Sequence, residues 1–302
     1  MNNYQSFAVT AIGSSHIKQD KDCQDYSYNY SEPKITLAVV ADGHGDDSCF
    51  RSKAGAMRAC YQALRGIVDF IESYEATSEQ KDEEWNRAIE NLIKHIIALW
   101  QIKVEEDYTK NPFSEKELAM ATEKYRKKYE SGESLNKAYG TTLITAAITE
   151  QYWLGIHIGD GRFTVLYPDG TFAQPVPWDD KCFLNATTSI CDDDAAERAR
   201  FYFSLITPEK PPPVAVFLCS DGVDDNYPVE ENEKHLYKLY NTIALTFAED
   251  GFESTCEQLQ ALANKFAIEG KGDDTSIAGF VDMEKLKEIA PILKEQHKGR
   301  LH

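Results

Sequence analysis

Two kinds of apolar pattern follow one another along the chain. Short, continuous apolar runs rich in β-branched residues, such as residues 35–41 and 214–219, are typical of buried strands. Longer stretches carry apolar residues at helical spacing on an otherwise polar background. In residues 79–108 the side chains with this spacing are Trp85, Ile89, Leu92, Ile96 and Trp100. The chain therefore combines strands and amphipathic helices.

The pattern predicts the position of each element. The predicted strands are 6–12, 26–30, 35–41, 140–149, 152–159, 163–167, 201–206, 214–219 and 275–281. The predicted helices are 48–74, 79–108, 114–129, 231–248, 252–268 and 282–296. Residues 16–25 are polar and predict a loop. The strands between residues 140 and 167 follow one another with only short turns, so antiparallel pairing is expected.

The same pattern gives no reason to divide the chain. It has 302 residues, with no internal repeat and no Gly/Ser-rich linker. We expect one domain over residues 1–302, which includes a helical stretch at 66–135. Residues 174–213 are the least regular part of the chain, and loops of that length are usually functional. We interpret them as a flap-like segment.

Composition narrows the class of partner. Apolar residues make up 42% of the chain, enough for a sizeable core, and the formal net charge is −18. Nucleic-acid binding requires clustered Lys and Arg, and anionic membrane surfaces attract the same residues. An acidic surface disfavours both partners. The sequence predicts no oligomeric state.

The cysteines and the N-terminal residues indicate the cellular compartment in which the protein is expected. The seven cysteines include no C-x-x-C pair, which argues against a zinc ribbon and against a disulfide framework. The first residues do not have the charged and apolar regions of a signal peptide, and the apolar runs are too short to span a bilayer. We expect a soluble cytoplasmic protein.

The first candidate for chemistry is Asp42-Gly43-His44-Gly45, which follows the strand at 35–41. A carboxylate and a free glycine carbonyl at a strand end suit a hard cation such as Mg²⁺ or Mn²⁺. His44 can transfer a proton near neutral pH. The alternative is a tight turn, because Asp-Gly after a strand is a common turn signal, with His44 an ordinary loop residue.

The recurrence of this pattern along the chain favours a metal site over a simple tight turn. Asp160, Asp221 and Asp273 also lie beside glycines at the ends of apolar strands. Strand ends from one sandwich gather at one rim, so these acids are expected to meet. Crowded carboxylates repel one another unless a positive charge lies between them. Divalent cations supply that charge.

Five motifs, in this order, resemble the metal-dependent protein serine/threonine phosphatases of type 2C. They are Asp42-Gly43-His44-Gly45, Tyr139-Gly140-Thr141-Thr142, Gly159-Asp160-Gly161-Arg162, Ser220-Asp221-Gly222-Val223-Asp224-Asp225 and Gly272-Asp273-Asp274-Thr275-Ser276. Each motif alone is weakly specific, but the ordered set is strong. The resemblance implies an α+β fold, an α-β-β-α sandwich of two antiparallel sheets flanked by helices, with a two-metal site at one end.

The resemblance also implies roles for individual residues. Asp42 matches the carboxylate that bridges two Mg²⁺ or Mn²⁺ ions, and Gly43 matches the carbonyl ligand. The other metal positions that it implies are Asp221 and Asp273 for the first metal, Asp160 and Asp225 for a third, weaker metal, and Asp25 in an acidic pair near the N-terminus. Gln24 replaces the first acid of that pair.

Other positions depart from the family pattern. The family often has a phosphate-binding arginine before the acidic pair, but residues 1–50 contain no arginine. His16, Lys18 or Lys21 could replace it, with Lys18 or His16 preferred; a lysine would act only as a point charge. Asp274 stands where asparagine is common. Asp224 replaces an apolar residue, and the sequence gives no reason for it.

The resemblance and the chemistry of the residues predict one reaction. Two metals lower the pKa of a bridging water, and the hydroxide attacks the phosphorus of a phosphorylated protein. His44 then protonates the serine or threonine leaving group. Two alternatives stay open: a catalytically weak phosphatase fold that serves as a binding or regulatory module, motivated by Gln24 and the missing arginine, and a small-molecule phosphomonoesterase.

Overall fold

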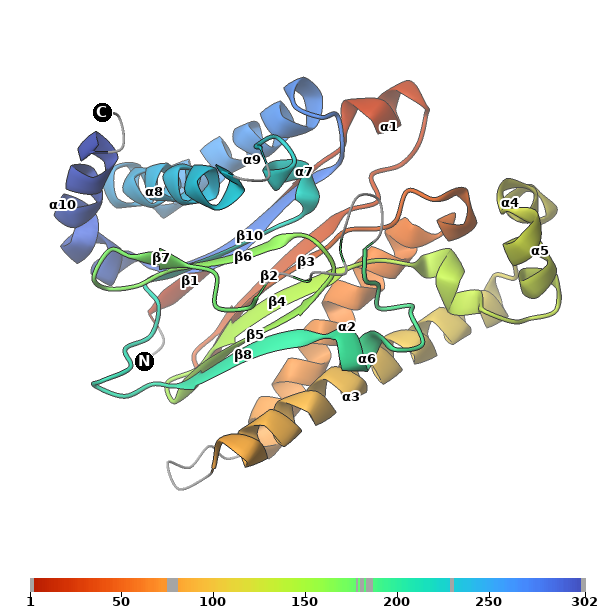
Figure 1. Ribbon diagram of the computed structural model, residues 1–302, viewed down its shortest axis with the longest axis horizontal. Coiled ribbons are helices and arrows are strands. Elements are labelled where there is room, and N and C mark those ends of the chain that lie inside the picture. The colour runs from red at the N-terminus through yellow and green to blue at the C-terminus, as the bar shows by residue number, and fades with distance from the viewer. Residues whose placement is uncertain are drawn as a thin grey trace.

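Two antiparallel five-stranded sheets lie face to face in the described part of the chain (Figure 1). The computed structural model describes residues 3–74, 81–177, 179, 182, 187–228 and 231–299. One sheet has the strand order β1 (Tyr4–Ala11), β10 (Thr275–Asp282), β9 (Ala215–Cys219), β6 (Arg162–Leu166) and β7 (Phe172–Ala173). The other has the order β2 (Tyr26–Glu32), β3 (Ile35–Ala41), β4 (Leu143–Ile148), β5 (Tyr152–Ile158) and β8 (Arg200–Leu205).

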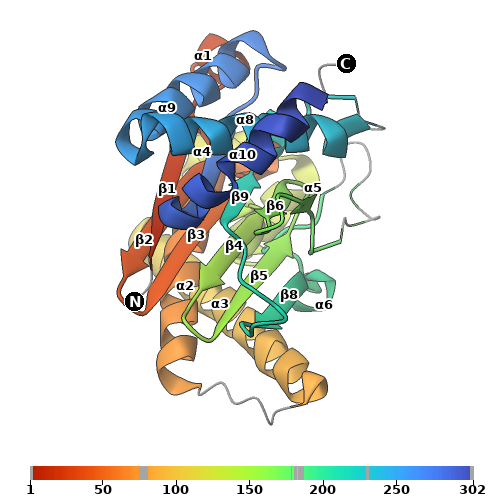
Figure 2. The same cartoon turned by 90° about the vertical axis from the view of Figure 1, so that its left-hand side faces the viewer.

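Helices cover the outer face of each sheet, as Figures 1 and 2 show. The helices α2 (Ser52–Ser73) and α3 (Asp82–Lys110) lie against the sheet that contains β3. The helices α8 (Asn232–Asp250), α9 (Phe252–Glu269) and α10 (Met283–Gly299) lie against the sheet that contains β9. The four layers confirm the predicted α-β-β-α sandwich.

The central strand β3 explains why its sequence is continuously apolar. Successive side chains of a strand point to opposite faces, and both faces of β3 are covered. Leu37 and Val39 pack toward α2 and α3, while Ala38 and Val40 pack between the two sheets. All four are fully buried. Their burial fixes the register of β3, because a shift by one residue would exchange the two faces.

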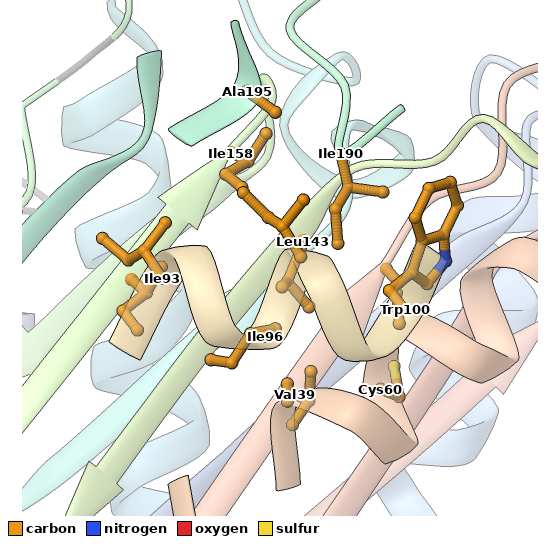
Figure 3. Packing of buried hydrophobic residues seen from close by; sticks show 14 of the residues in the cluster. Val39, Cys60, Ile93, Ile96, Trp100, Leu143, Ile158, Ile190 and Ala195 are labelled. Atoms are coloured by element: carbon orange, nitrogen blue, oxygen red, sulfur yellow. The ribbon is translucent and has the colours of Figure 1, made fainter. Parts of the chain in front are cut away.

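The layer between the sheet and the helices is filled by large side chains (Figure 3). Trp100 and Ile96 of α3 lie beside Val39 of β3 and Leu143 of β4. The indole of Trp100 donates a hydrogen bond to the carbonyl of Gly55, at 3.0 Å. Trp100 and Ile96 belong to the helical stripe predicted from the sequence. Burial of each of these two side chains contributes about 2 kcal/mol or more to the free energy of folding.

Two predicted helices are interrupted. The segment 48–74 begins with a 3₁₀ turn, η1 (Asp47–Cys49), before α2. The segment 114–129 divides into α4 (Glu115–Met120) and α5 (Glu123–Glu130). Between them, Thr122 is extended and its carbonyl accepts hydrogen bonds from the first turn of α5. Helical propensity did not reveal this break, because it depends on a contact with Ser48, whose hydroxyl hydrogen-bonds Thr122.

Four further short elements lie in predicted loops. Residues 16–25 are only partly a loop, because α1 (Ser14–Lys18) extends into them. The others are η2 (Leu135–Tyr139), α6 (Ala195–Arg198) and α7 (Asp221–Asp224). In the flap-like segment 174–213, residues 178, 180–181 and 183–186 lie outside the described residues, as do residues 75–80 of the helical stretch 66–135. Among the described helices, none has the length and apolarity needed to cross a membrane.

Candidate active site

Loops from both sheets meet around one polar cavity of about 510 Å³. Asp42 follows β3, Asp160 lies between β5 and β6, and Asp221 begins α7 after β9. Asp225 follows α7, and Asp273 precedes β10. The other residues that line the cavity are Ser15, His16, Gln19, Lys21, Gln24, Gly43, His44, Gly45, Thr142, Thr187 and Asp274. The structure therefore brings six of the seven predicted metal ligands together with His44, all except Asp25.

Hydrogen bonds from the segment after η2 hold the loop after β3. The backbone N–H of Thr142 and the hydroxyl of Thr141 both donate to the carbonyl of Asp42, each at 2.8 Å. The N–H of His44 donates to the carbonyl of Gly140 at 3.0 Å. A Cβ on Gly43 would lie 2.6 Å from the carbonyl oxygen of Gln24, so this close approach requires glycine.

The carboxylates of the cavity repel one another: Asp42, Asp160 and Asp221 are half-buried, whereas Asp225 and Asp273 are more exposed. Burial raises the pKa of Asp42 well above its ordinary value, and the neighbouring Asp25 and Asp221 raise it further. Burial also raises the pKa of Asp221, as does Asp160. Asp273 likewise has a pKa raised mainly by burial. The metal-free site is electrostatically unfavourable at neutral pH, which a divalent cation would correct.

Two further observations bear on whether the cavity suits a divalent cation. Within the described ranges, no three His, Cys, Asp or Glu side chains already surround a common point as metal ligands. However, the buried Oδ1 of Asp221 has no hydrogen-bond partner in the described part of the chain. Carboxylate and carbonyl oxygens are the donors that Mg²⁺ and Mn²⁺ bind. The residues present therefore fit these ions by donor type and by charge.

Asp25 and Gln24 differ in their place at the site. Asp25 is 4% exposed and accepts a hydrogen bond from the hydroxyl of Ser220 at 2.7 Å. Burial raises the pKa of Asp25 to about 7. Asp25 is not among the residues that line the cavity, whereas Gln24 is, and the Nε2 of Gln24 donates to the hydroxyl of Ser52 at 2.7 Å.

His44 is partly buried at the edge of the cavity. Burial lowers the pKa of His44 to about 4, and the positive charge of Lys137 acts in the same direction. The imidazole is therefore neutral at pH 7 in the metal-free, substrate-free protein. A nearby dianionic phosphate would favour the protonated form.

The two preferred phosphate-binding candidates are placed differently. His16 lines the cavity, and its Nδ1 lies 2.9 Å from Oδ2 of Asp274. Lys18 is exposed on α1 and does not line the cavity, whereas Lys21 does. Asp274 also accepts hydrogen bonds from the N–H groups of Gly13 at 2.7 Å and Gln24 at 2.6 Å. These contacts give the carboxylate of Asp274 a structural role in holding the N-terminal loop.

Asp224, for which the sequence offers no reason, forms an ion pair in the structure. The Nε of Arg162 donates to Oδ2 of Asp224 at 2.7 Å. Sequence reasoning placed Arg162 in a motif but gave it no role. The signal available was its position two residues after Asp160 and the unusual acid beside Asp225.

The family assignment comes from a comparison of sequences. The family model described as protein phosphatase 2C matches residues 12–262. The chain belongs to the protein phosphatase 2C family. The type 2C resemblance, and with it the coarse assignment as a protein serine/threonine phosphatase, is therefore confirmed. No curated protein sequence matches the chain.

Solved structures agree with the fold of this type 2C phosphatase. The catalytic domain of the serine/threonine protein phosphatase PstP, in complex with two manganese ions, has a TM-score of 0.53 and 14% identity. Stp1 from Staphylococcus aureus has a TM-score of 0.52 and 17% identity, and PppA from Pseudomonas aeruginosa has 0.53 and 15%. The alignments cover 92%, 93% and 92% of this chain, and 97%, 95% and 97% of the other chains, respectively.

Proposed function

We propose that this type 2C phosphatase hydrolyses phosphoserine and phosphothreonine in proteins and requires Mg²⁺ or Mn²⁺, with residues 1–302 acting as one catalytic domain. The observation that carries the proposal is the convergence of carboxylates from distant loops in one polar cavity beside His44. The manganese ions in the structure of PstP support the choice of cation.

The cavity residues would hold two cations. Asp42, the carbonyl of Gly43, Asp221 and Asp273 are the proposed ligands, while Asp160 and Asp225 could hold a third, weaker ion. When bound, such cations lower the pKa of water and neutralise charge on phosphoryl oxygens. Asp25 does not line the cavity, and its proposed contribution is its hydrogen bond with Ser220, the residue before Asp221.

His44 is the proposed general acid. A serine or threonine alkoxide is a poor leaving group, so its departure requires a proton. The hydrogen bond from its backbone N–H to the carbonyl of Gly140 fixes the loop that carries the imidazole. The phosphate dianion of a bound substrate would raise the pKa of His44 from about 4 and so load the proton that is then donated.

The phosphate group must also meet a cationic side chain. We propose His16 and Lys21 for this role, because both line the cavity. Lys18 could contribute only if α1 moved or its side chain reached over the rim, since it is exposed and lies outside the lining. None of these side chains can bind phosphate with the two parallel bonds of an arginine.

Assays of hydrolysis test the proposal. A phosphothreonine peptide and p-nitrophenyl phosphate should be hydrolysed with Mn²⁺ and not with excess chelator. Asp221→Asn should lose activity, whereas Asp250→Asn, at the end of α8 away from the cavity, should retain it. Activity that survives chelation or Asp221→Asn would reject the proposal.

The two alternatives predict other results. A binding or regulatory module, favoured by Gln24 and by the missing arginine, would bind Mn²⁺ in calorimetry and hydrolyse no phosphopeptide. A small-molecule phosphomonoesterase would hydrolyse p-nitrophenyl phosphate and small phosphate esters but not phosphopeptides.

A further inference from the structure

A buried ion pair joins two of the loops that supply carboxylates to the cavity. Arg162 begins β6, two residues after Asp160, and Asp224 ends α7, next to Asp225. The Nε of Arg162 lies 2.7 Å from Oδ2 of Asp224, and the two side chains are 13% and 4% exposed. The pair therefore connects the proposed ligand Asp160 with the proposed ligand Asp225.

Asp224 is held on a second side by α8. The side-chain amide of Asn232 donates to the carbonyl oxygen of Asp224 at 2.9 Å and to its Oδ2 at 3.3 Å. Oδ2 thus accepts hydrogen bonds from both Arg162 and Asn232, while no residue that the structure describes hydrogen-bonds the buried Oδ1. These contacts fix α7, the single turn that begins with Asp221 and leads into Asp225.

For a cation at Asp160 and Asp225, the positive charge of Arg162 matters as much as the contact between Arg162 and Asp224. Arg162 lies two residues after Asp160 and contacts Asp224 beside Asp225, so its guanidinium adds a positive charge next to both proposed ligands. A guanidinium stays charged in proteins, so a position near it is unfavourable for a divalent cation. Asp224 brings an opposite charge into contact with Arg162 and makes the pair neutral.

We propose that Asp224 is a positioning and charge-balancing residue: paired with Arg162, it fixes Asp160 and Asp225 and prevents the guanidinium charge from opposing a divalent cation between them. The inference rests on the proposed function of the cavity. It also explains an acid at a position that is apolar in the family pattern.

Calorimetric titration with Mn²⁺ tests the inference without using activity. Asp224→Asn removes the carboxylate that pairs with Arg162 and should weaken the weakest class of Mn²⁺ site by about tenfold or more, as loss of a ligand-orienting contact does. Adding Arg162→Met removes the guanidinium charge as well and should recover part of the lost affinity. Asp224→Leu provides the same test where Asp224→Asn does not fold.

A matched control separates this role from general stability. Arg58 and Asp107 form another largely buried pair, at 2.6 Å and with side chains 19% and 18% exposed, between α2 and α3. Neither residue lines the cavity. Arg58→Met should lower the melting temperature and should reduce the Mn²⁺ affinity far less than Asp224→Asn does.

The outcomes distinguish the inference from the proposed function. A wild-type protein that binds no Mn²⁺ would overturn the cation-dependent function and this inference together. A wild-type protein that binds Mn²⁺, with an Asp224 variant of equal affinity, would overturn the inference alone. A double variant that binds no better than the Asp224 variant would also overturn the charge-balancing role.

Discussion

At Asp221, burial has opposite consequences for the metal-free and the metal-bound protein. The carboxylate is close to Asp42 and Asp160, and one of its oxygens has no hydrogen-bond partner within the described ranges. Without a cation, its negative charge is both poorly solvated and repelled. With a cation, the same surroundings strengthen the attraction, because little water screens it.

The first prediction concerns this residue. Burial raises the pKa of Asp221 above its unfolded value, so its contribution to stability is present at low pH and is lost as pH rises above the unfolded value, near 3.9. Asp221→Asn removes this cost and should raise the melting temperature of the metal-free protein at pH 7 by about 2 °C or more. Mn²⁺ should stabilise the wild type and not the variant, as measured by calorimetry with and without chelator. A metal-free variant less stable than wild type would contradict this.

The second prediction concerns His157, which has no place in the mechanism. Its side chain is buried in β5, and neither ring nitrogen has a hydrogen-bond partner among the described residues. Burial lowers its pKa well below 6.5, with Arg200 and Arg162 acting in the same direction. The unfolded chain therefore binds a proton that the folded chain does not.

The contribution of His157 to stability should thus be complete above pH 6.5 and should fall by about 1.4 kcal/mol for each pH unit below it. Urea unfolding at pH 7.5 and 5.5 should show a larger loss for wild type than for His157→Gln. Other titrating groups cancel in this difference. An equal loss in both proteins would mean that His157 titrates normally in the folded state.

At the scale of elements, the helical stretch supports the loop that carries His44. Arg51, before α2, binds Glu117 of α4 through Nε at 2.7 Å and the hydroxyl of Tyr139 through Nη1 at 2.7 Å. That hydroxyl donates to Asp107 of α3, also at 2.7 Å. Because Tyr139 precedes Gly140, this network reaches the residue that accepts the hydrogen bond of His44.

The third prediction follows from this network. Arg51→Met leaves two carboxylates with a reduced counter-charge and should lower the free energy of unfolding by about 3 kcal/mol. Arg126→Met removes an exposed ion pair with Glu130 and should cost less than about 1 kcal/mol. Urea unfolding of both variants at neutral pH measures the difference. Equal effects would show that the network is no stronger than a surface pair.

Sequence periodicity predicted the elements that are governed by burial. The strand β3 and the stripe on α3 follow directly from continuous or helically spaced apolar residues, because each packs against a sheet or a helix layer. Periodicity did not predict the break at Thr122, which depends on Ser48, far away in sequence. It also could not pair Arg162 with Asp224, because the pair depends on the folded positions of two loops.

At the scale of the whole molecule, the sandwich places its chemistry at one rim. Both sheets contribute: the loops after β3 and β5 belong to one, and those after β9 and before β10 to the other. The ordered acids predicted this convergence because strand ends of packed sheets share an edge. Their roles as ligands and the role of His44 remain predictions, since they concern bound ions and a substrate.

The most direct test of the account is diffraction from crystals soaked in Mn²⁺, recorded near the manganese absorption edge. We predict two strong anomalous peaks inside the cavity, with oxygens of Asp42, Asp221 and Asp273 within about 2.5 Å of them. A third, weaker peak is expected beside Asp160 and Asp225. Crystals with no peak among Asp42, Asp221 and Asp273 at saturating Mn²⁺ would contradict the account.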